Sequence, residues 1–171
     1  AVIAPTALVL AGGQDALLGE IAGGETRVGV AFAEGIAARL DAGITSADGT
    51  ISGKSLFVLD ANADQYLVAT AAKAIYLVAA NAEGVERQTL NTVDRTRSTA
   101  ELKFDNAPAT LVCDDPAVFI KALHAGRVAL AADTLGAAQC MLDQAVIYAK
   151  QRTQFNRVIA SFQAVKHMCA E

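Results

Sequence analysis

The pattern of apolar and polar positions changes once along the chain, near Asp114-Asp115-Pro116. Before this point, short runs rich in Val, Ile, Thr and Leu alternate with turn sequences such as Asp48-Gly49, which is typical of a β-hairpin. Such runs predict β-strands at residues 26–32, 43–47, 55–59, 66–70, 75–79 and 100–104. Because no helical segment separates these strands, they favour a small antiparallel barrel or sandwich.

After this point the pattern becomes helical. From Pro116 to about Gln151 there is no further proline, and Asp114 or Asp115 suits the N-cap of a helix that begins there. The predicted helix has roughly 35 residues and a length of about 50 Å. Its apolar surface predicts packing against other helices. Residues 152–160 are predicted to form a loop, followed by a second helix capped by Ser161.

These patterns predict an α+β protein, with a small antiparallel β-barrel domain followed by the long helices of an up-down helical bundle. The expected boundaries are 1–24 for the end of an N-terminal helical region, 25–113 for the barrel, and 114–171 for the start of the bundle. The chain begins with Ala and ends within a predicted helix, which is the pattern expected of part of a longer protein.

Composition limits the classes of function. Hydrophobic residues make up 53% of the 171 residues and charged residues 19%, which excludes a disordered chain. The net charge of -4 disfavours nucleic-acid binding. Residues 1–115 carry 8 Lys and Arg against 15 Asp and Glu, whereas residues 116–171 carry 6 against 3. This basic end indicates an anionic ligand or an acidic neighbour, although an ordinary amphipathic surface explains it almost as well.

Other candidate chemistry is weak. The three cysteines include no C-x-x-C pair, and His124 and His167 have no metal-ligand partner at short helical spacing, so we expect unpaired thiols and no metal site. Unpaired cysteines and the absence of an uncharged run of about 20 residues predict a cytoplasmic protein without a membrane span. Residues 49–55 imitate a phosphate-binding loop, but a strand-like segment follows, so a hairpin turn is the better interpretation.

The specific signal is the segment Tyr148-Ala-Lys-Gln-Arg-Thr-Gln-Phe-Asn-Arg-Val-Ile-Ala-Ser-Phe-Gln163. It resembles the Y-x-x-x-R-x-Q-F-G-x-x-I-x-x-F-Q signature of the acyl-CoA dehydrogenase family, with Asn156 in place of the glycine. That glycine follows a helix end, where a left-handed backbone is expected, and Asn is the best substitute for glycine there. Residues 17–25, 52–64 and 94–104 resemble upstream segments of the family in the same order.

The resemblance implies an FAD-dependent enzyme that oxidises the α–β bond of an acyl-CoA thioester to the enoyl-CoA. By position it implies contacts to the adenosine pyrophosphate of FAD, across a subunit interface, from Arg152, Gln154, Phe155 and Gln163. It implies that Phe57 flanks the isoalloxazine ring, and that His124 and Arg127 lie near the CoA thioester. Implied partners are the acyl-CoA, an electron-transfer flavoprotein or similar acceptor, and further subunits in a homo- or hetero-oligomer such as a dimer of dimers.

Three departures indicate a divergent member. The flavin-binding T-E-P-x-[AG]-G-S loop stands here as residues 33–39, with Ala33 in place of Thr and without the Gly-Ser pair. Leu59 replaces a threonine after the flavin-flanking aromatic residue. Gly126 occupies one of the family's two positions for the catalytic Glu, and the other position lies beyond Glu171, so the catalytic base is unknown.

Two alternatives remain beside the catalytic subunit. One is a non-catalytic partner subunit of a hetero-oligomeric acyl-CoA dehydrogenase that contributes part of the FAD site. The departures resemble those of paired actinobacterial subunits, a group for which steroid thioesters are substrates. The other is a scaffold with altered activity, such as a nucleic-acid-associated flavoprotein, which the net charge of -4 disfavours.

Overall fold

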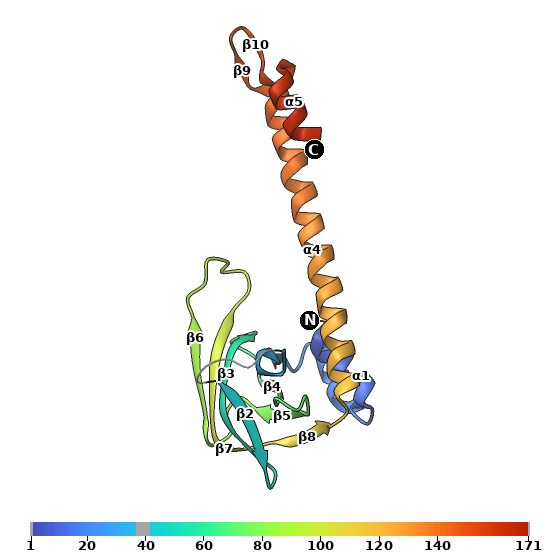
Figure 1. Cartoon of the computed structure of the whole chain (residues 1–171), viewed down its shortest axis with the longest axis vertical. Helices are drawn as coiled ribbons and strands as arrows, with labels where there is room; N and C mark the ends of the chain where they lie inside the picture. Colours follow the sequence, from blue (N-terminus) through green and yellow to red (C-terminus); the bar gives the residue numbers. More distant parts are fainter. Residues whose placement is uncertain (1, 37–41, 171) are drawn as a thin grey trace. The chain divides into compact units, whose positions relative to one another are not determined.

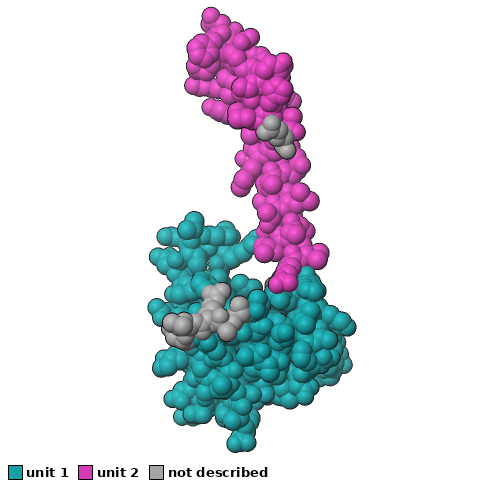
Figure 2. All heavy atoms as spheres, viewed as in Figure 1, with its two compact units in different colours: residues 1–126 teal, residues 127–171 magenta. Residues whose placement is uncertain are grey.

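The computed structural model describes residues 2–36 and 42–170. The chain divides into two compact units, Ala1–Gly126 and Arg127–Glu171 (Figure 2). The first unit holds two helices, a sheet, a short helix and the start of a long helix, and the second holds the rest of that helix, a small hairpin and a short terminal helix (Figure 1).

The helices are α1 Ile3–Ala11, α2 Asp15–Gly23, α3 Ala33–Ile36, α4 Pro116–Gln151 and α5 Gln163–Ala170, with a 3-10 turn at Ile159–Ser161. The strands are β1 Val28–Ala31, β2 Gly43–Ala47, β3 Thr50–Leu59, β4 Gln65–Ala69, β5 Ile75–Ala79, β6 Val85–Leu90, β7 Thr99–Pro108, β8 Thr110–Cys113, β9 Thr153–Gln154 and β10 Arg157–Val158.

The described residues contain an eight-stranded sheet in the order β6-β7-β3-β1-β4-β5-β8, with β2 paired to β3 (Figure 1). The α+β class is confirmed, but the predicted antiparallel barrel is wrong in two respects. The pair β1 and β4 is parallel, with Val28 opposite Gln65. The two ends of the sheet, β6 and β8, do not pair with each other in the described part of the chain.

The sheet stays open because β6 is a polar strand. The sequence pattern does not predict this strand. Its central residues Glu86, Arg87, Gln88 and Thr89 are all exposed, so neither face of the strand is apolar. A strand without an apolar face gains little from closing over the core. Among the described residues, β6 pairs with β7 alone, as one arm of a hairpin. Strand β8, also unpredicted, is four residues long and pairs with β5.

The hydrophobic core lies on both faces of β4. Tyr66 and Val68 belong to a cluster formed within the sheet, whereas Leu67 and Ala69 belong to a second cluster formed with the helices. This division follows the period of two along a strand. The second cluster includes Leu8 of α1 and Phe119 of α4. The sheet therefore carries α1, α2 and the first turns of α4 on one of its faces.

The long helix begins and ends as the sequence predicts. Asp115 caps it, because its Oδ1 accepts a hydrogen bond from the backbone N–H of Ala117 at 2.8 Å. Only its first turns are covered within the first unit, through residues such as Phe119 and Ala122. From Arg127 onward most side chains are exposed, including large apolar ones: Val128, Leu130, Leu135, Met141 and Ile147. The predicted packing against further helices stays a prediction.

The predicted loop after α4 contains more structure than expected. Residues 153–158 form the β9–β10 hairpin, followed by the 3-10 turn. Ser161 does not cap α5, because the helix begins at Gln163 and Phe162 lies between them. The cap prediction was wrong because Ser161 is the last residue of the 3-10 turn, where its hydroxyl donates to the carbonyl oxygen of Val158 at 2.7 Å.

Candidate cofactor site

The β9–β10 hairpin carries the signature segment. Its two-residue turn is Phe155-Asn156, with φ values of 53° and 60°. Asn156 therefore has the left-handed backbone that we expected. The cause is different, however: positive φ at both central residues is the requirement of a tight hairpin turn, not of the end of α4.

The register of this hairpin places three polar side chains on one face. Gln154 lies opposite Arg157, so the two side chains project from the same side of the ladder. The ladder continues to Arg152, whose carbonyl oxygen accepts from the N–H of Ile159 at 2.8 Å. Arg152 is two residues from Gln154 and so shares its face. The face carries two guanidinium groups and one amide.

Phe162 holds part of this face in place. The guanidinium carbon of Arg157 lies 4.0 Å from the centre of the Phe162 ring. Phe155 meets the same ring edge-on at 6.1 Å and is itself 86% exposed. A cation stacked on an aromatic ring loses less freedom when it binds a ligand. The sequence analysis missed Arg157, although its place directly after a two-residue turn was a usable signal, because it fixes Arg157 opposite Gln154.

The charge around the hairpin is of one sign. Residues 144–170 contain Lys150, Arg152, Arg157 and Lys166, and no Asp or Glu. Arg152, Gln154 and Gln163 are all exposed. One guanidinium group can donate to two phosphate oxygens at once, and side-chain amides add neutral donors. The donor set therefore fits the diphosphate of a dinucleotide cofactor such as FAD.

Phe57 lies in the other unit, on β3. It has φ of 55° and is 54% exposed, while Val58 beside it is fully buried. The register between β3 and β7 shifts between Ser55 and Val58, which is the mark of a β-bulge. The bulge places the aromatic ring of Phe57 on the outside of the strand, next to the buried Val58. An outward aromatic ring of this kind can stack on a flat heterocycle.

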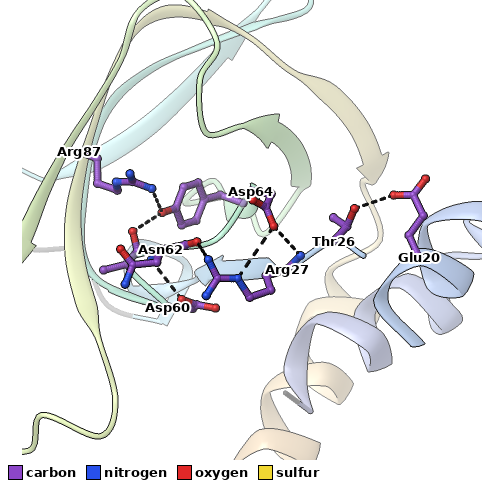
Figure 3. A network of polar contacts seen from close by, with 9 residues as sticks. Glu20, Thr26, Arg27, Asp60, Asn62, Asp64 and Arg87 are labelled. Atoms are coloured by element: carbon purple, nitrogen blue, oxygen red, sulfur yellow. Dashed lines mark hydrogen bonds and ion pairs between the residues drawn. The ribbon is translucent and has the colours of Figure 1, made fainter. Parts of the chain in front are cut away.

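A polar network fixes the turn that follows β3 (Figure 3). The Arg27 backbone N–H donates to Asp64 Oδ2 at 2.9 Å, and its guanidinium donates to the carbonyl oxygen of Asn62. Tyr66 Oη donates to the carbonyl oxygen of Ala61 at 3.0 Å and accepts from Arg87. Asp64, the last residue of the segment 52–64 that resembles the family, therefore has a structural role, because it joins this turn to the residue before β1.

We expect Asp64→Ala to lower the free energy of unfolding by about 1 kcal/mol, because a backbone N–H loses its charged acceptor. The matched control is Glu86→Ala, which removes an exposed ion pair to Lys103 and should change stability by less than about 0.5 kcal/mol. Denaturant titration of the full-length protein measures both. Equal effects of the two substitutions would contradict the structural role given to Asp64.

The residues expected near a substrate lie on α4. His124 and Arg127 are exposed and three positions apart, so they share one face of the helix. Gly126 between them packs against α1: a Cβ built there would lie 2.4 Å from Cγ1 of Ile3. A larger side chain at this position would require the Ile3 side chain to move.

The segment that imitates a phosphate-binding loop forms a hairpin in the structure. Residues 49–55 form the β2–β3 turn and the first part of β3, with left-handed backbone at Asp48 and Gly49, so the hairpin interpretation is confirmed. Lys54 pairs with Glu101 at 2.8 Å.

In the segment that resembles the flavin-binding loop, Ala33 and Glu34 lie in α3, whereas Ala37, Ala38 and Arg39 lie outside the described residues. The described residues contain no group of three His, Cys, Asp or Glu that could hold a metal ion.

The structure brings Arg152, Gln154, Phe155 and Gln163 into one segment of the second unit and adds Arg157 to them. Phe57 and His124 belong to the first unit. The expectation that these residues form a single cofactor and substrate site stays a prediction. No helix in the described ranges is both long and apolar enough to cross a membrane.

This fold, in which the sheet is followed by a long helix, matches solved structures of acyl-CoA dehydrogenases. A solved variant of the Tcur3481–Tcur3483 steroid ACAD superposes with a TM-score of 0.85 and 32% identity, over 98% of this chain and 49% of that one. The family model "Acyl-CoA dehydrogenase, C-terminal domain" matches residues 117–171. The chain belongs to the acyl-CoA dehydrogenase family.

Curated relatives agree with this assignment. Acyl-CoA dehydrogenase FadE34 of Mycobacterium tuberculosis is 32% identical over 157 residues, which cover 88% of this chain and 20% of that protein. The caffeyl-CoA reductase-Etf complex subunit CarC of Acetobacterium woodii is 46% identical over 52 residues, 30% of this chain and 14% of that one. The chain spans about half the length of the steroid ACAD structure and a smaller share of these relatives.

Proposed function

We propose that this chain is part of an FAD-dependent acyl-CoA dehydrogenase that converts an acyl-CoA thioester to its α,β-enoyl-CoA. The observation that carries the proposal is the hairpin face with Arg152, Gln154 and Arg157, in a segment without carboxylates. Bound FAD would supply the acceptor for the hydride that leaves the β-carbon. All other roles belong to the protein, which binds, orients and shields the reacting groups.

The cofactor contacts are assigned by the chemistry of each side chain. Arg152 and Arg157 neutralise the diphosphate, Gln154 and Gln163 donate amide hydrogen bonds, and the exposed Phe155 ring covers apolar surface of the adenosine. Phe57 flanks the flavin ring. The proposed site is completed across a subunit interface, which makes a homo- or hetero-oligomer, such as a dimer of dimers, part of the proposal.

For the substrate, we assign His124 and Arg127 to the CoA thioester side of the site. Gly126 cannot abstract a proton, so the base that removes the α-proton is assigned to the family's other position, beyond residue 171. The electron acceptor is proposed to be an electron-transfer flavoprotein, in line with the Etf complex of CarC. A cytoplasmic location is proposed because the three cysteines of this chain are free.

A second function is favoured by specific departures. Ala33 and Leu59 lack the hydroxyls that would hydrogen-bond flavin or substrate, and Gly126, which packs against Ile3, has no side chain that could abstract a proton. These losses suit a subunit that contributes Arg152, Gln154 and Gln163 to FAD held mainly by another chain. The similarity to a steroid ACAD with two named components supports such pairing, and makes a steroid thioester one candidate substrate.

The deciding experiment is a visible absorption spectrum of the purified full-length protein, recorded alone and then anaerobically with fatty acyl-CoA or steroid-CoA thioesters. We expect a flavin spectrum that bleaches on addition of the correct thioester. A colourless protein that takes up FAD only with a partner chain would establish the partner-subunit function instead. A protein that binds no flavin in either state would contradict both.

A further inference from the structure

Glu34 is a buried carboxylate that the proposed function does not use. It lies on α3 and is only 4% exposed. Its Oε2 accepts a hydrogen bond from the Ser55 hydroxyl, and its Oε1 accepts from the backbone N–H of Leu56 at 2.8 Å. Burying a carboxylate is costly unless such bonds satisfy it. Both donors lie on β3, immediately before Phe57.

Phe57 needs external support to keep its conformation. It combines a bulky side chain with φ of 55°, a backbone region that such residues rarely adopt. Conformations of this kind persist only where the surrounding structure over-determines them. On one side of Phe57, the backbone pairing of Val58 with Ala100 holds the strand. On the other side, the two hydrogen bonds to Glu34 hold Ser55 and Leu56.

The element that carries Glu34 is itself fixed in the core. Phe32 directly precedes α3, and the centre of its ring lies 4.9 Å from that of Phe119 on α4. A Cβ added to Gly35 would lie 2.8 Å from the Phe119 ring, so α3 sits in close contact with α4. Glu34 therefore lies in a segment that is packed against α4, and its hydrogen bonds link the bulge to that segment.

We propose that Glu34 is a positioning residue: it holds the β3 bulge through Ser55 and Leu56 and so fixes the outward ring of Phe57. That this ring contacts flavin rests on the proposed function, but the positioning of the ring does not. A carboxylate suits the task because its two oxygens can accept from two different donors at once.

The local test is amide hydrogen exchange at Leu56 in the full-length protein. We expect Glu34→Leu, which removes both acceptors, to accelerate exchange at Leu56 at least tenfold. Glu34→Gln keeps one acceptor for Leu56 N–H and offers an amide N–H to Ser55, so exchange should stay within threefold of the parent. The matched control is Val58→Ala, which destabilises the same strand by leaving a cavity but leaves both hydrogen bonds in place.

The ring itself can be followed with Phe57→Trp, since residues 1–171 contain no tryptophan. The difference in fluorescence between proteins with and without this substitution isolates the new indole. We expect its anisotropy to fall when Glu34→Leu is added and to be retained with Glu34→Gln or Val58→Ala. If Glu34→Leu does not fold, Ser55→Ala removes one of the two bonds and should give a smaller change in the same direction.

The outcomes distinguish this inference from the proposed function. Unchanged Leu56 exchange and indole anisotropy in a folded Glu34→Leu protein would overturn the positioning role, whatever the flavin content. Equal responses to Glu34→Leu and Val58→Ala would also overturn it, since general loss of stability would then explain both. If both signals respond to Glu34→Leu alone but the protein binds no flavin, the positioning role stands and only the proposed contact between Phe57 and flavin fails.

Discussion

Replacing Arg152 by alanine is expected to weaken FAD retention by the full-length protein at least tenfold. Arg152 shares a hairpin face with Gln154 and Arg157, where a guanidinium can meet two phosphate oxygens at once. Hydrogen bonds to charged groups contribute about 1.5–3 kcal/mol each, and about 1.4 kcal/mol corresponds to tenfold in affinity. Equilibrium dialysis of the apoprotein with FAD measures the change.

The control for this prediction is Lys150→Ala, which removes one positive charge two residues earlier, within the last turn of α4. We expect it to change FAD affinity less than threefold, because only long-range attraction is lost. Arg157→Ala should fall between the two. If Arg152→Ala and Lys150→Ala weaken FAD binding equally, the hairpin face acts only through its net charge and the assignment of Arg152 to the diphosphate is wrong.

Gly53→Ala is expected to destabilise the protein by about 3 kcal/mol or more. Gly53 has φ of 125°, and a Cβ there would lie 2.0 Å from the carbonyl oxygen of Gly43 on β2. That atom belongs to the backbone of a paired strand, so relief requires β2 and β3 to separate. The midpoint of thermal unfolding of the full-length protein measures the loss.

Gly49→Ala tests the steric part of this explanation. Gly49 lies in the same hairpin with φ of 78°, but nothing lies within 4 Å of an added Cβ. Only the left-handed backbone is then strained, at a cost of about 1 kcal/mol. A Gly53→Ala protein no less stable than Gly49→Ala would show that β2 shifts freely, and that the close approach of the two strands does not stabilise the fold.

Local features of the fold could be predicted because they depend on residues close together in the chain. The β2–β3 turn followed from Asp48-Gly49, and the start of α4 followed from Asp115 and Pro116. Strand β6 could not be predicted in this way. Its polar sequence offers no apolar face, and it forms because β7 supplies a complete set of backbone partners.

The candidate site likewise contains residues that local sequence predicts and residues whose role depends on contacts in the folded chain. The signature around Arg152 was readable because its residues lie within one short segment and their spacing is itself the signal. Arg157 was not recognised, since its importance depends on standing opposite Gln154 and on stacking over Phe162. From the sequence, Glu34 was recognised only as part of the segment 33–39, which departs from the family's flavin-binding loop. Its two hydrogen bonds join residues more than 20 positions apart.

The family, the α+β class, the long helix and the basic character of the signature segment could be inferred from the sequence alone, because these depend on composition, short-range spacing and local backbone preference. The three-dimensional structure was needed to show that the sheet is open, that β1 and β4 run parallel, that Gly126 packs against Ile3, and that Glu34 accepts a hydrogen bond from the strand next to Phe57. Each of these is a contact between distant segments. Such contacts depend on which faces remain apolar, and which polar groups remain unsatisfied, once the local elements have formed.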